Sequence, residues 1–310
     1  MRIALLIFAS AIIFLSFSKK EKEDPFFYKN IEKGMCLIPG GSMNNDTFCV
    51  KKCGLTFECP IQKLNVDSFY LCNHEVSNLE YREFINSVRK DSGDLYKKFL
   101  PDTSLWNDAL TYGQEYIEWY FRHPAYNNYP VVGITHEQAK AYCAWLTKKY
   151  MDNEKRKFKN AVFKLPTINQ WTYAAKGGAE ALIPFKNGKL TDKKGEYQAS
   201  FRSIDQLNIR NNEINYNCQH KRATSRFSLK LTCSNNQIVP LPIFSNPKSH
   251  YNLYNLAGNV EEYVAEKGIT KGGGWKDTGY FLQNCVSQTY DSTNAVSTDR
   301  GFRVAMEIVK

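Results

Sequence analysis

The chain has 310 residues, of which 43% are hydrophobic and 23% are charged, and this balance is that of a globular protein. It excludes a collagen-like chain, disorder over most of the length and a protein with several membrane spans. The formal net charge of +10 favours solubility and leaves open an anionic partner such as nucleic acid, a lipid headgroup or an acidic protein.

Residues 1–18 have the pattern of a secretory signal peptide. Arg2 is basic, residues 3–17 are almost wholly apolar, and Ser16 and Ser18 are the small residues of a cleavage site. We therefore expect cleavage after Ser18 and an exported protein, located in the periplasm or at the outer membrane. A bacterial lipoprotein would carry Cys where Ser18 stands, so the sequence gives no lipid attachment point.

Residues 19–33 follow as a charged linker, and we expect one folded domain over residues 34–310. Nine cysteines lie in it, so in an exported protein disulfides are the first hypothesis and at least one thiol is free or pairs outside the chain. Cys218 and Cys233 are fifteen residues apart in a polar stretch, and we expect them to be bonded. Cys49, Cys53 and Cys59 could instead be zinc thiolates, but no His lies nearby to complete the site.

Two short strands are predicted near the start of the domain. Residues 35–38 are apolar and run into the turn signal Pro39-Gly40-Gly41, and Phe69-Tyr70-Leu71 forms the second strand.

Three helices are predicted by their starts. In each, a Ser or Thr is followed three residues later by Glu or Gln, and apolar residues continue at helical spacing. This is the capping box, in which the hydroxyl accepts from a free backbone N–H and the later side chain reaches back. The boxes are Ser77–Glu80, Thr135–Gln138 and Thr167–Gln170.

Long polar and aromatic stretches separate these elements, near residues 91–130 and 185–250. Helix content is low, strands are short and no repeat of fixed period is visible. The predicted fold is therefore an irregular α+β domain with long structured loops and few short helices.

A series of short motifs, in a fixed order, runs from about Gly34 to the C-terminus. In chain order they include MCLIPGGS at 35–42, EVSN at 75–78, YCAW at 142–145, KLPT at 164–167, NLAGNV at 255–260, KGGGW at 271–275 and GFRV at 301–304. The series resembles the formylglycine-generating-enzyme domain, also called the sulfatase-modifying-factor domain. The resemblance implies an irregular fold related to C-type lectins.

A second set of motifs is not general to that domain. It comprises LPDT at 100–103, YFRHPAY at 120–126 and YPVVG at 129–133. These segments resemble the GldK/PorK-type lipoproteins of gliding motility and type IX secretion. The resemblance implies a building block of a periplasmic ring at the outer membrane.

Catalysis is the point on which the sequence departs from the enzymes of the family. The resemblance implies a copper site made by two thiolates shortly after the Gly-Gly-Ser-Trp motif, because Cu(I) selects soft ligands. Those positions correspond here to Asp277 and to Leu282, or Tyr280 if the loop shifts, so we expect no copper and no catalytic residues. Cys143 and Cys285 are interpreted as buried thiols, and His123 as a packed turn residue.

A structural calcium site is also implied by the resemblance. It would use side-chain oxygens of Asn255 and Glu262 and the backbone carbonyls of Gly258 and Val260, since hard oxygen ligands suit Ca²⁺. The alternative is a turn at residues 255–262 that caps itself without a metal.

Three functions remain open. The first is a non-catalytic module that binds envelope proteins through its aromatic insert at residues 100–130, with Trp106 and Tyr126 as anchors. The alternative for this insert is a loop that only packs on its own domain. The second is a formylglycine-generating-type oxidase that modifies exported proteins. The third is a binder of anionic glycan or lipid at the membrane periphery, through Lys148-Lys149, residues 155–157 and Lys221-Arg222. Nucleic acid is not an expected partner of an exported protein.

Overall fold

The computed structural model describes residues 34–45, 49–50, 56–57, 62–109, 113–178, 181–204, 231–233, 239–292 and 295–309. The predicted signal peptide, the charged linker and Cys218 lie outside these residues. So do the side chains of Cys49, Cys53, Cys59 and Cys233.

The first sheet brings the two ends of the domain together. Its four antiparallel strands lie in the order β1 (Met35–Ile38), β6 (Phe69–Cys72), β14 (Ala305–Ile308) and β7 (Ala161–Lys164). Both predicted strands are confirmed, and they pair with each other with Leu37 opposite Tyr70. The C-terminal strand β14 lies between β6 and β7.

All three predicted capping boxes are confirmed, and each begins a helix. They start α2 (Asn78–Ser92), α5 (His136–Met151) and α6 (Ile168–Lys176). The third helix ends at Gly177, whose φ of 61° is the left-handed conformation that glycine adopts without steric cost.

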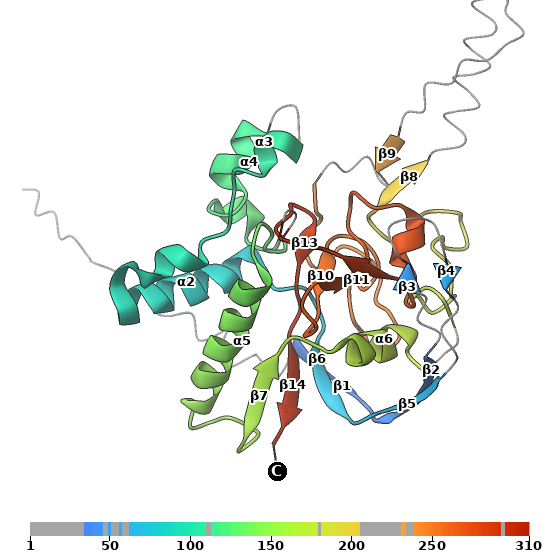
Figure 1. Cartoon of the computed structure of the whole chain (residues 1–310), viewed down its shortest axis with the longest axis horizontal. Helices are drawn as coiled ribbons and strands as arrows, with labels where there is room; N and C mark the ends of the chain where they lie inside the picture. Colours follow the sequence, from blue (N-terminus) through green and yellow to red (C-terminus); the bar gives the residue numbers. More distant parts are fainter. Residues whose placement is uncertain are drawn as a thin grey trace, which may run out of the picture.

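The first sheet separates two hydrophobic clusters, because successive strand residues point to opposite faces. Phe163 and Met306 face the cluster that α2 and α5 cover, whereas Leu71 and Ala305 face the cluster under α6. Figure 1 shows α2 and α5 on one side of these strands and α6 on the other.

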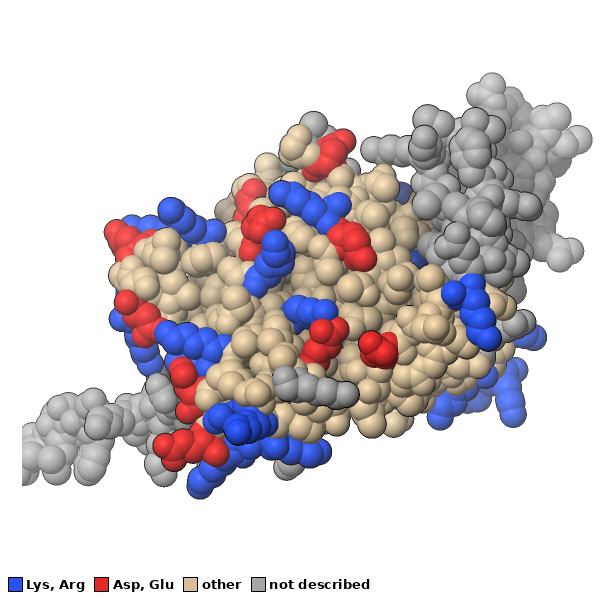
Figure 2. All heavy atoms as spheres, turned by 60° about the horizontal axis from the view of Figure 1, so that its bottom comes forward, with Lys and Arg blue, Asp and Glu red and all other residues tan. Residues whose placement is uncertain are grey.

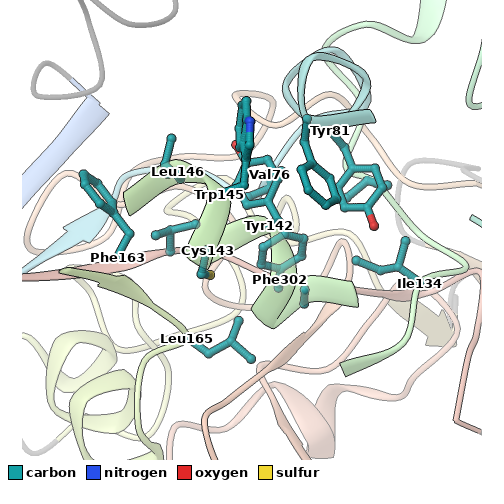
Figure 3. Close-up of a cluster of buried hydrophobic side chains, with 14 of the residues drawn as sticks. Val76, Tyr81, Ile134, Tyr142, Cys143, Trp145, Leu146, Phe163, Leu165 and Phe302 are labelled. Carbon is teal, nitrogen blue, oxygen red and sulfur yellow. The ribbon is translucent and has the colours of Figure 1, made fainter. Parts of the chain in front are cut away.

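Stacked and edge-on rings fill the first cluster. Tyr142 on α5 lies 5.8 Å, centroid to centroid, from Tyr81 on α2 and 5.4 Å from Phe302 (Figure 3). Rings at these separations add stabilisation to that of their buried area. Many of the aromatic residues in the sequence thus pack against one another inside the domain.

The second sheet is smaller and carries the residues considered below. Its order is β12 (Ser287–Thr289), β11 (Ile269–Lys271), β10 (Glu261–Tyr263) and β13 (Arg300–Gly301), and β10 and β13 run parallel. The other strands form two-stranded pairs: β2 (Gly41–Asn45) with β5 (Gln62–Val66), β3 (Cys49–Val50) with β4 (Thr56–Phe57), and β8 (Arg202–Ile204) with β9 (Leu231–Cys233).

The stretch near 91–130 contains short helices that the sequence analysis did not predict. They are η1 (Gly93–Phe99), α3 (Trp106–Ala109), α4 (Gln114–Trp119) and η2 (Pro124–Tyr126). Asn78 at the start of α2 attaches this insert, because its Nδ2 donates to the carbonyls of Tyr120 and Tyr126. In Figure 1 α3 and α4 project above α2, away from the first sheet.

Charge is distributed over the surface with both signs. In Figure 2 basic and acidic side chains lie beside one another over much of the face shown. Within the described ranges, no helix has the length and apolar character that crossing a membrane requires.

Candidate functional site

Two neighbouring glutamates on β10 organise the candidate site. Glu261 and Glu262 are both buried, and because strand side chains alternate they point to opposite faces of the second sheet. Each accepts from an arginine of the C-terminal segment, Glu261 from Arg300 and Glu262 from Arg303.

We call the first group the Glu262–Arg303 centre, and it also contains Glu75, Asn255 and Asn259. Arg303 Nε lies 2.7 Å from Glu262 Oε2 and 2.9 Å from Oε1. The indole Nε1 of Trp171 donates to Oε2 at 2.7 Å. Arg303 also donates to the carbonyls of Cys72 and Tyr254, so its charge is satisfied in full burial.

Glu75 is the second carboxylate of this centre. Asn255 Nδ2 donates to its Oε2 and Asn259 Nδ2 to its Oε1, both at 2.9 Å. Burial raises the pKa of Glu75 to about 7; the charge of Arg303 opposes the rise and that of Glu262 adds to it. Two amides and one arginine therefore hold two buried carboxylates at one place.

The structure brings Asn255 and Glu262, two residues of the predicted calcium set, to this centre. Both Glu262 oxygens are engaged by Arg303 and Trp171, while Asn255 Oδ1 is buried without a hydrogen bond. Gly258 and Val260 lie in the same buried segment. A cation would have to compete with Arg303 for Glu262, so these contacts favour the alternative of a turn at residues 255–262 that caps itself without a metal.

We call the group on the opposite face the Glu261–Arg300 centre, and it also contains Thr270, Asp277 and Asp299. Arg300 donates to Glu261 Oε1 from Nε at 2.7 Å and from Nη2 at 2.6 Å, and Thr270 Oγ1 donates to Oε2. Burial raises the pKa of Glu261, against the opposing charge of Arg300.

Asp277 stands at the first of the two positions that the resemblance assigns to copper thiolates. It closes a turn, because the Gly274 N–H donates to Asp277 Oδ2 at 2.7 Å and Asp277 N–H donates back to the Gly274 carbonyl. Burial and the charge of Asp299 raise the pKa of Asp277 to about 6. The second position, Leu282, is fully buried in a small hydrophobic cluster.

The cysteines and histidines with described side chains make no alternative metal centre. Among these residues, no group of three or more His, Cys, Asp or Glu is arranged to hold a metal ion. Cys143 and Cys285 are buried, as predicted, and burial raises the pKa of Cys143. His123 is confirmed as a turn residue, since its Nδ1 accepts from the Ala125 N–H that begins η2.

Glu75, Asn259 and Arg303 lie in motifs of the ordered series, but nothing in those motifs assigns them a role. A signal was available: a charged residue within an apolar segment rarely becomes buried without a partner. Arg303 lies between Phe302 and Val304, and that context indicates a buried ion pair. It does not indicate which glutamate is the partner.

The expectation that Trp106 anchors a partner is wrong. Its side chain is 1% exposed and packs 4.8 Å from Tyr120 and 6.4 Å from Trp275, ring centroid to centroid. Tyr126 is only partly buried, but it contacts Tyr120 and Tyr129. The rings of the insert attach it to its own domain, and among the side chains of its helices that the structure describes, Trp119 is an exposed aromatic residue at 49%.

The sequence matches one protein family and is similar to several known proteins. The family model of the sulfatase-modifying factor enzyme 1-like domain matches residues 23–308. The chain is 22% identical to the formylglycine-generating enzyme of Mus musculus, over 88% of this chain and 75% of that protein. It is 23% identical to the inactive C-alpha-formylglycine-generating enzyme 2 of Bos taurus, over 87% of each.

Among solved structures, PvdO from Pseudomonas aeruginosa has the same fold, with a TM-score of 0.55 at 15% identity. The superposition covers 88% of this chain and 94% of that one. The predicted α+β fold class and the predicted family are thereby confirmed.

Proposed function

Because the chain belongs to the sulfatase-modifying factor enzyme 1-like domain family, we propose that it is a non-catalytic member that acts by binding another protein of the cell envelope. The observation that carries the proposal is the chemistry of the two copper positions. The Asp277 carboxylate accepts from the Gly274 N–H and closes a turn, and the Leu282 side chain packs in a hydrophobic cluster.

A cuprous ion needs soft ligands at a fixed separation, and neither residue supplies one. A carboxylate that already accepts from a backbone N–H is a hard ligand, and a leucine is none. The mammalian relative whose name marks it as inactive supports the idea that this fold persists without catalysis.

The insert at residues 100–130 is the surface that we propose for docking. Its short helices are attached to the domain by Asn78 and by the Trp106 packing, which keeps its outer surface in a fixed position. Trp119 is half exposed at the end of α4, in edge-on contact with His123 at 5.6 Å. An exposed tryptophan on a rigid support is typical of a binding anchor.

The setting that we propose is a gliding-motility or type IX secretion-like assembly. It is supported by the resemblance of residues 100–133 to GldK/PorK-type proteins and by the N-terminal sequence, which predicts export. In this setting the partner is an envelope protein, such as a ring-forming secretion component, and contact with a membrane is peripheral.

The test is affinity purification of the tagged chain from native envelopes, followed by mass spectrometry, with two variants. Trp119→Ala should lose the main partner, since truncating an anchor costs at least about 2 kcal/mol, or roughly thirtyfold in affinity. Tyr280→Ala is the matched control, because Tyr280 is 40% exposed on another element, η4 (Gly279–Leu282). Equal recovery of the partner with both variants would contradict docking through the insert.

The second candidate is a formylglycine-generating-type oxidase. It is favoured by the formylglycine-generating relatives and requires a metal site other than the family's thiolate pair. This candidate predicts turnover of a cysteine-containing peptide, which the docking proposal does not.

A further inference from the structure

Exposed aliphatic side chains gather at one end of the first sheet. Ile308, the last residue of β14, is 47% exposed, and Val309 after it is 49% exposed. Val162 on the neighbouring strand β7 is 41% exposed. Val162 lies opposite Glu307 in the register, so its side chain and that of Ile308 point to opposite faces of the same strand end. We call Val162, Ile308 and Val309 the sheet tip.

A basic segment adjoins the sheet tip. It comprises residues 148–159, which lead from the last turn of α5 towards β7. Its backbone continues into Asn160, whose carbonyl accepts from the Val309 N–H at 3.2 Å, so the segment and the sheet tip meet. Two acidic residues, Asp152 and Glu154, lie in the segment beside six basic ones. The basic residues are Lys148, Lys149, Lys155, Arg156, Lys157 and Lys159.

Hydrogen bonds hold the basic segment in a fixed shape. Arg156 donates from Nε to the Lys159 carbonyl at 3.1 Å and from Nη1 to the Asn153 carbonyl at 3.2 Å. The Phe158 N–H donates to the Tyr150 hydroxyl at 3.0 Å, which attaches the segment to α5. Because this backbone is fixed, the lysines that project from it present their charge at a defined place beside the sheet tip.

Two lysines of the basic segment keep their charge available to an external group. Lys155 and Lys159 are exposed, and neither forms an ion pair with a residue that the structure describes. Lys164 on β7, in contrast, is paired with Glu307 at 2.7 Å. A run of basic residues alone is usually a solvated face. Here exposed aliphatic side chains border the run, and this second feature indicates a bilayer, because apolar groups enter the interface while ammonium groups stay at anionic headgroups.

We propose that the sheet tip and the basic segment together form a surface that contacts an anionic lipid bilayer. In Figure 1 the ends of β7 and β14 lie at the bottom of the molecule, whereas α3 and α4 lie at its top. Figure 2 turns the bottom forward, and basic side chains gather at its lower left with acidic ones between them. A chain bound in this way keeps its insert free for a protein partner. The inference rests on the proposed envelope setting, which supplies the membrane.

The experiment measures co-sedimentation of the purified chain with two kinds of vesicle. One contains phosphatidylcholine alone, and the other contains phosphatidylcholine with phosphatidylglycerol. Partitioning should be at least about tenfold greater on the anionic vesicles, and added salt should reduce it, because salt screens the attraction between exposed charges. Equal partitioning on the two kinds of vesicle overturns the proposal.

A double variant tests the lysines. Lys155→Gln with Lys159→Gln should weaken partitioning on the anionic vesicles at least about tenfold, since each lysine near the membrane surface contributes to the attraction. Lys193→Gln with Lys194→Gln is the matched control, because both residues are exposed in another turn and the change in net charge is the same. Equal losses in the two double variants would assign the binding to net charge and overturn the proposal.

A single variant tests the sheet tip. Ile308→Ser should reduce partitioning several-fold, because less apolar area enters the interface. Leu182→Ser is the control, since Leu182 is 50% exposed on another part of the chain and should not contribute. Each variant is first shown to keep the melting temperature of the unchanged chain. An unaltered partitioning of Ile308→Ser overturns the insertion of the sheet tip.

Two further results separate the alternatives. Retention on heparin that is lost in the Lys155 and Lys159 variant, without vesicle binding by the unchanged chain, would assign the surface to a soluble polyanion and overturn the proposal. After detergent extraction, the same variant should recover the envelope partner as fully as the unchanged chain does, whereas Trp119→Ala should not. Loss of lipid binding and loss of the protein partner are therefore distinct outcomes.

Discussion

Glu261 and Glu262 are neighbours on one strand, yet their ion pairs have different surroundings. Glu262 and Arg303 are enclosed by the Trp171 indole and by backbone carbonyls, with Glu75 and its two asparagines in the same centre. Glu261 and Arg300 lie beside Asp299 and the partly exposed Asp277, and Arg300 stacks 4.6 Å from the Tyr290 ring.

This difference in surroundings indicates a different role for each centre. The Glu262–Arg303 centre connects β10, the 255–259 turn and the end of β6, and it has no polar atom left on Glu262 for a ligand. The Glu261–Arg300 centre borders the turn at Gly274, which contains Asp277, one of the two positions that the resemblance assigns to copper thiolates. We therefore assign the first centre a structural role, and under the proposed function the second borders two positions that supply no thiolates.

The largest predicted effect comes from removing the enclosed arginine. Arg303→Met should cost about 3–5 kcal/mol of unfolding free energy, because it leaves Glu262 charged and unpaired in the interior. Arg300→Met should cost roughly 2 kcal/mol, since Glu261 keeps the Thr270 hydroxyl and lies nearer to water.

Urea unfolding of both variants measures this difference. Glu262→Gln in the Arg303→Met background is the control, and it should restore part of the loss by removing the unpaired charge. Equal losses for the two arginine variants would show that the centres do not differ in enclosure.

The next effect is a pH dependence of stability to which Glu75 contributes, beside Glu261, whose pKa burial also raises. Its pKa of about 7 lies above its ordinary value of 4.5, so the folded state keeps a proton that the unfolded chain has released. The stabilisation from this proton is complete below about pH 4.5 and is lost as the pH rises through about 7. The melting temperature should therefore fall between pH 5 and pH 8.

Glu75→Gln tests this assignment, because the amide cannot titrate. The slope of melting temperature against pH should become shallower in the variant, whatever its absolute stability. An unchanged slope would assign the pH dependence to other groups.

A smaller effect of the same sign is expected on the opposite side of β10. Burial raises the pKa of Asp277 to about 6 from 3.8, so Asp277→Asn should remove a loss of stability that occurs between about pH 4 and pH 6. The effect should be on the order of 1 kcal/mol or less, because Asp277 is partly exposed. If Asp277→Asn changed the pH dependence of stability more than Glu75→Gln does, the centre of Asp277 would be the one that contributes more to that dependence.

Calcium should have the smallest effect. With Glu262 engaged by Arg303 and Trp171, we expect the melting temperature to be the same in excess Ca²⁺ and in chelator. A rise with added Ca²⁺ that is lost in Asn255→Ala would restore the calcium site and show that Glu262 exchanges partners.

The sequence predicted the local structure best where one short pattern decides it. The boxes at Ser77, Thr135 and Thr167 each contain every atom that the cap needs within four residues, and all three formed. The motif series likewise identified the family, because seven ordered segments are specific even at low identity.

Long-range geometry decided what the sequence did not predict. Trp106 is a typical anchor by residue type, but Trp275 and Tyr120 surround it, and only the folded chain shows this. The pairing of Glu261 with one arginine and of Glu262 with another, on opposite faces of the sheet, also depends on tertiary contacts, since β10 pairs with both β11 and β13. Short helices such as α3 have too few residues for a periodic signal.

The absence of copper chemistry is the central claim, and one measurement tests it directly. Purified chain is incubated with Cu(I), its copper content is determined, and a cysteine-containing peptide is assayed for conversion to formylglycine. The formylglycine-generating enzyme of Mus musculus serves as the positive control. Because Asp277 and Leu282 offer no thiolates, the chain should retain less than stoichiometric copper and leave the peptide unchanged. One copper per chain together with formylglycine in the peptide would contradict the account.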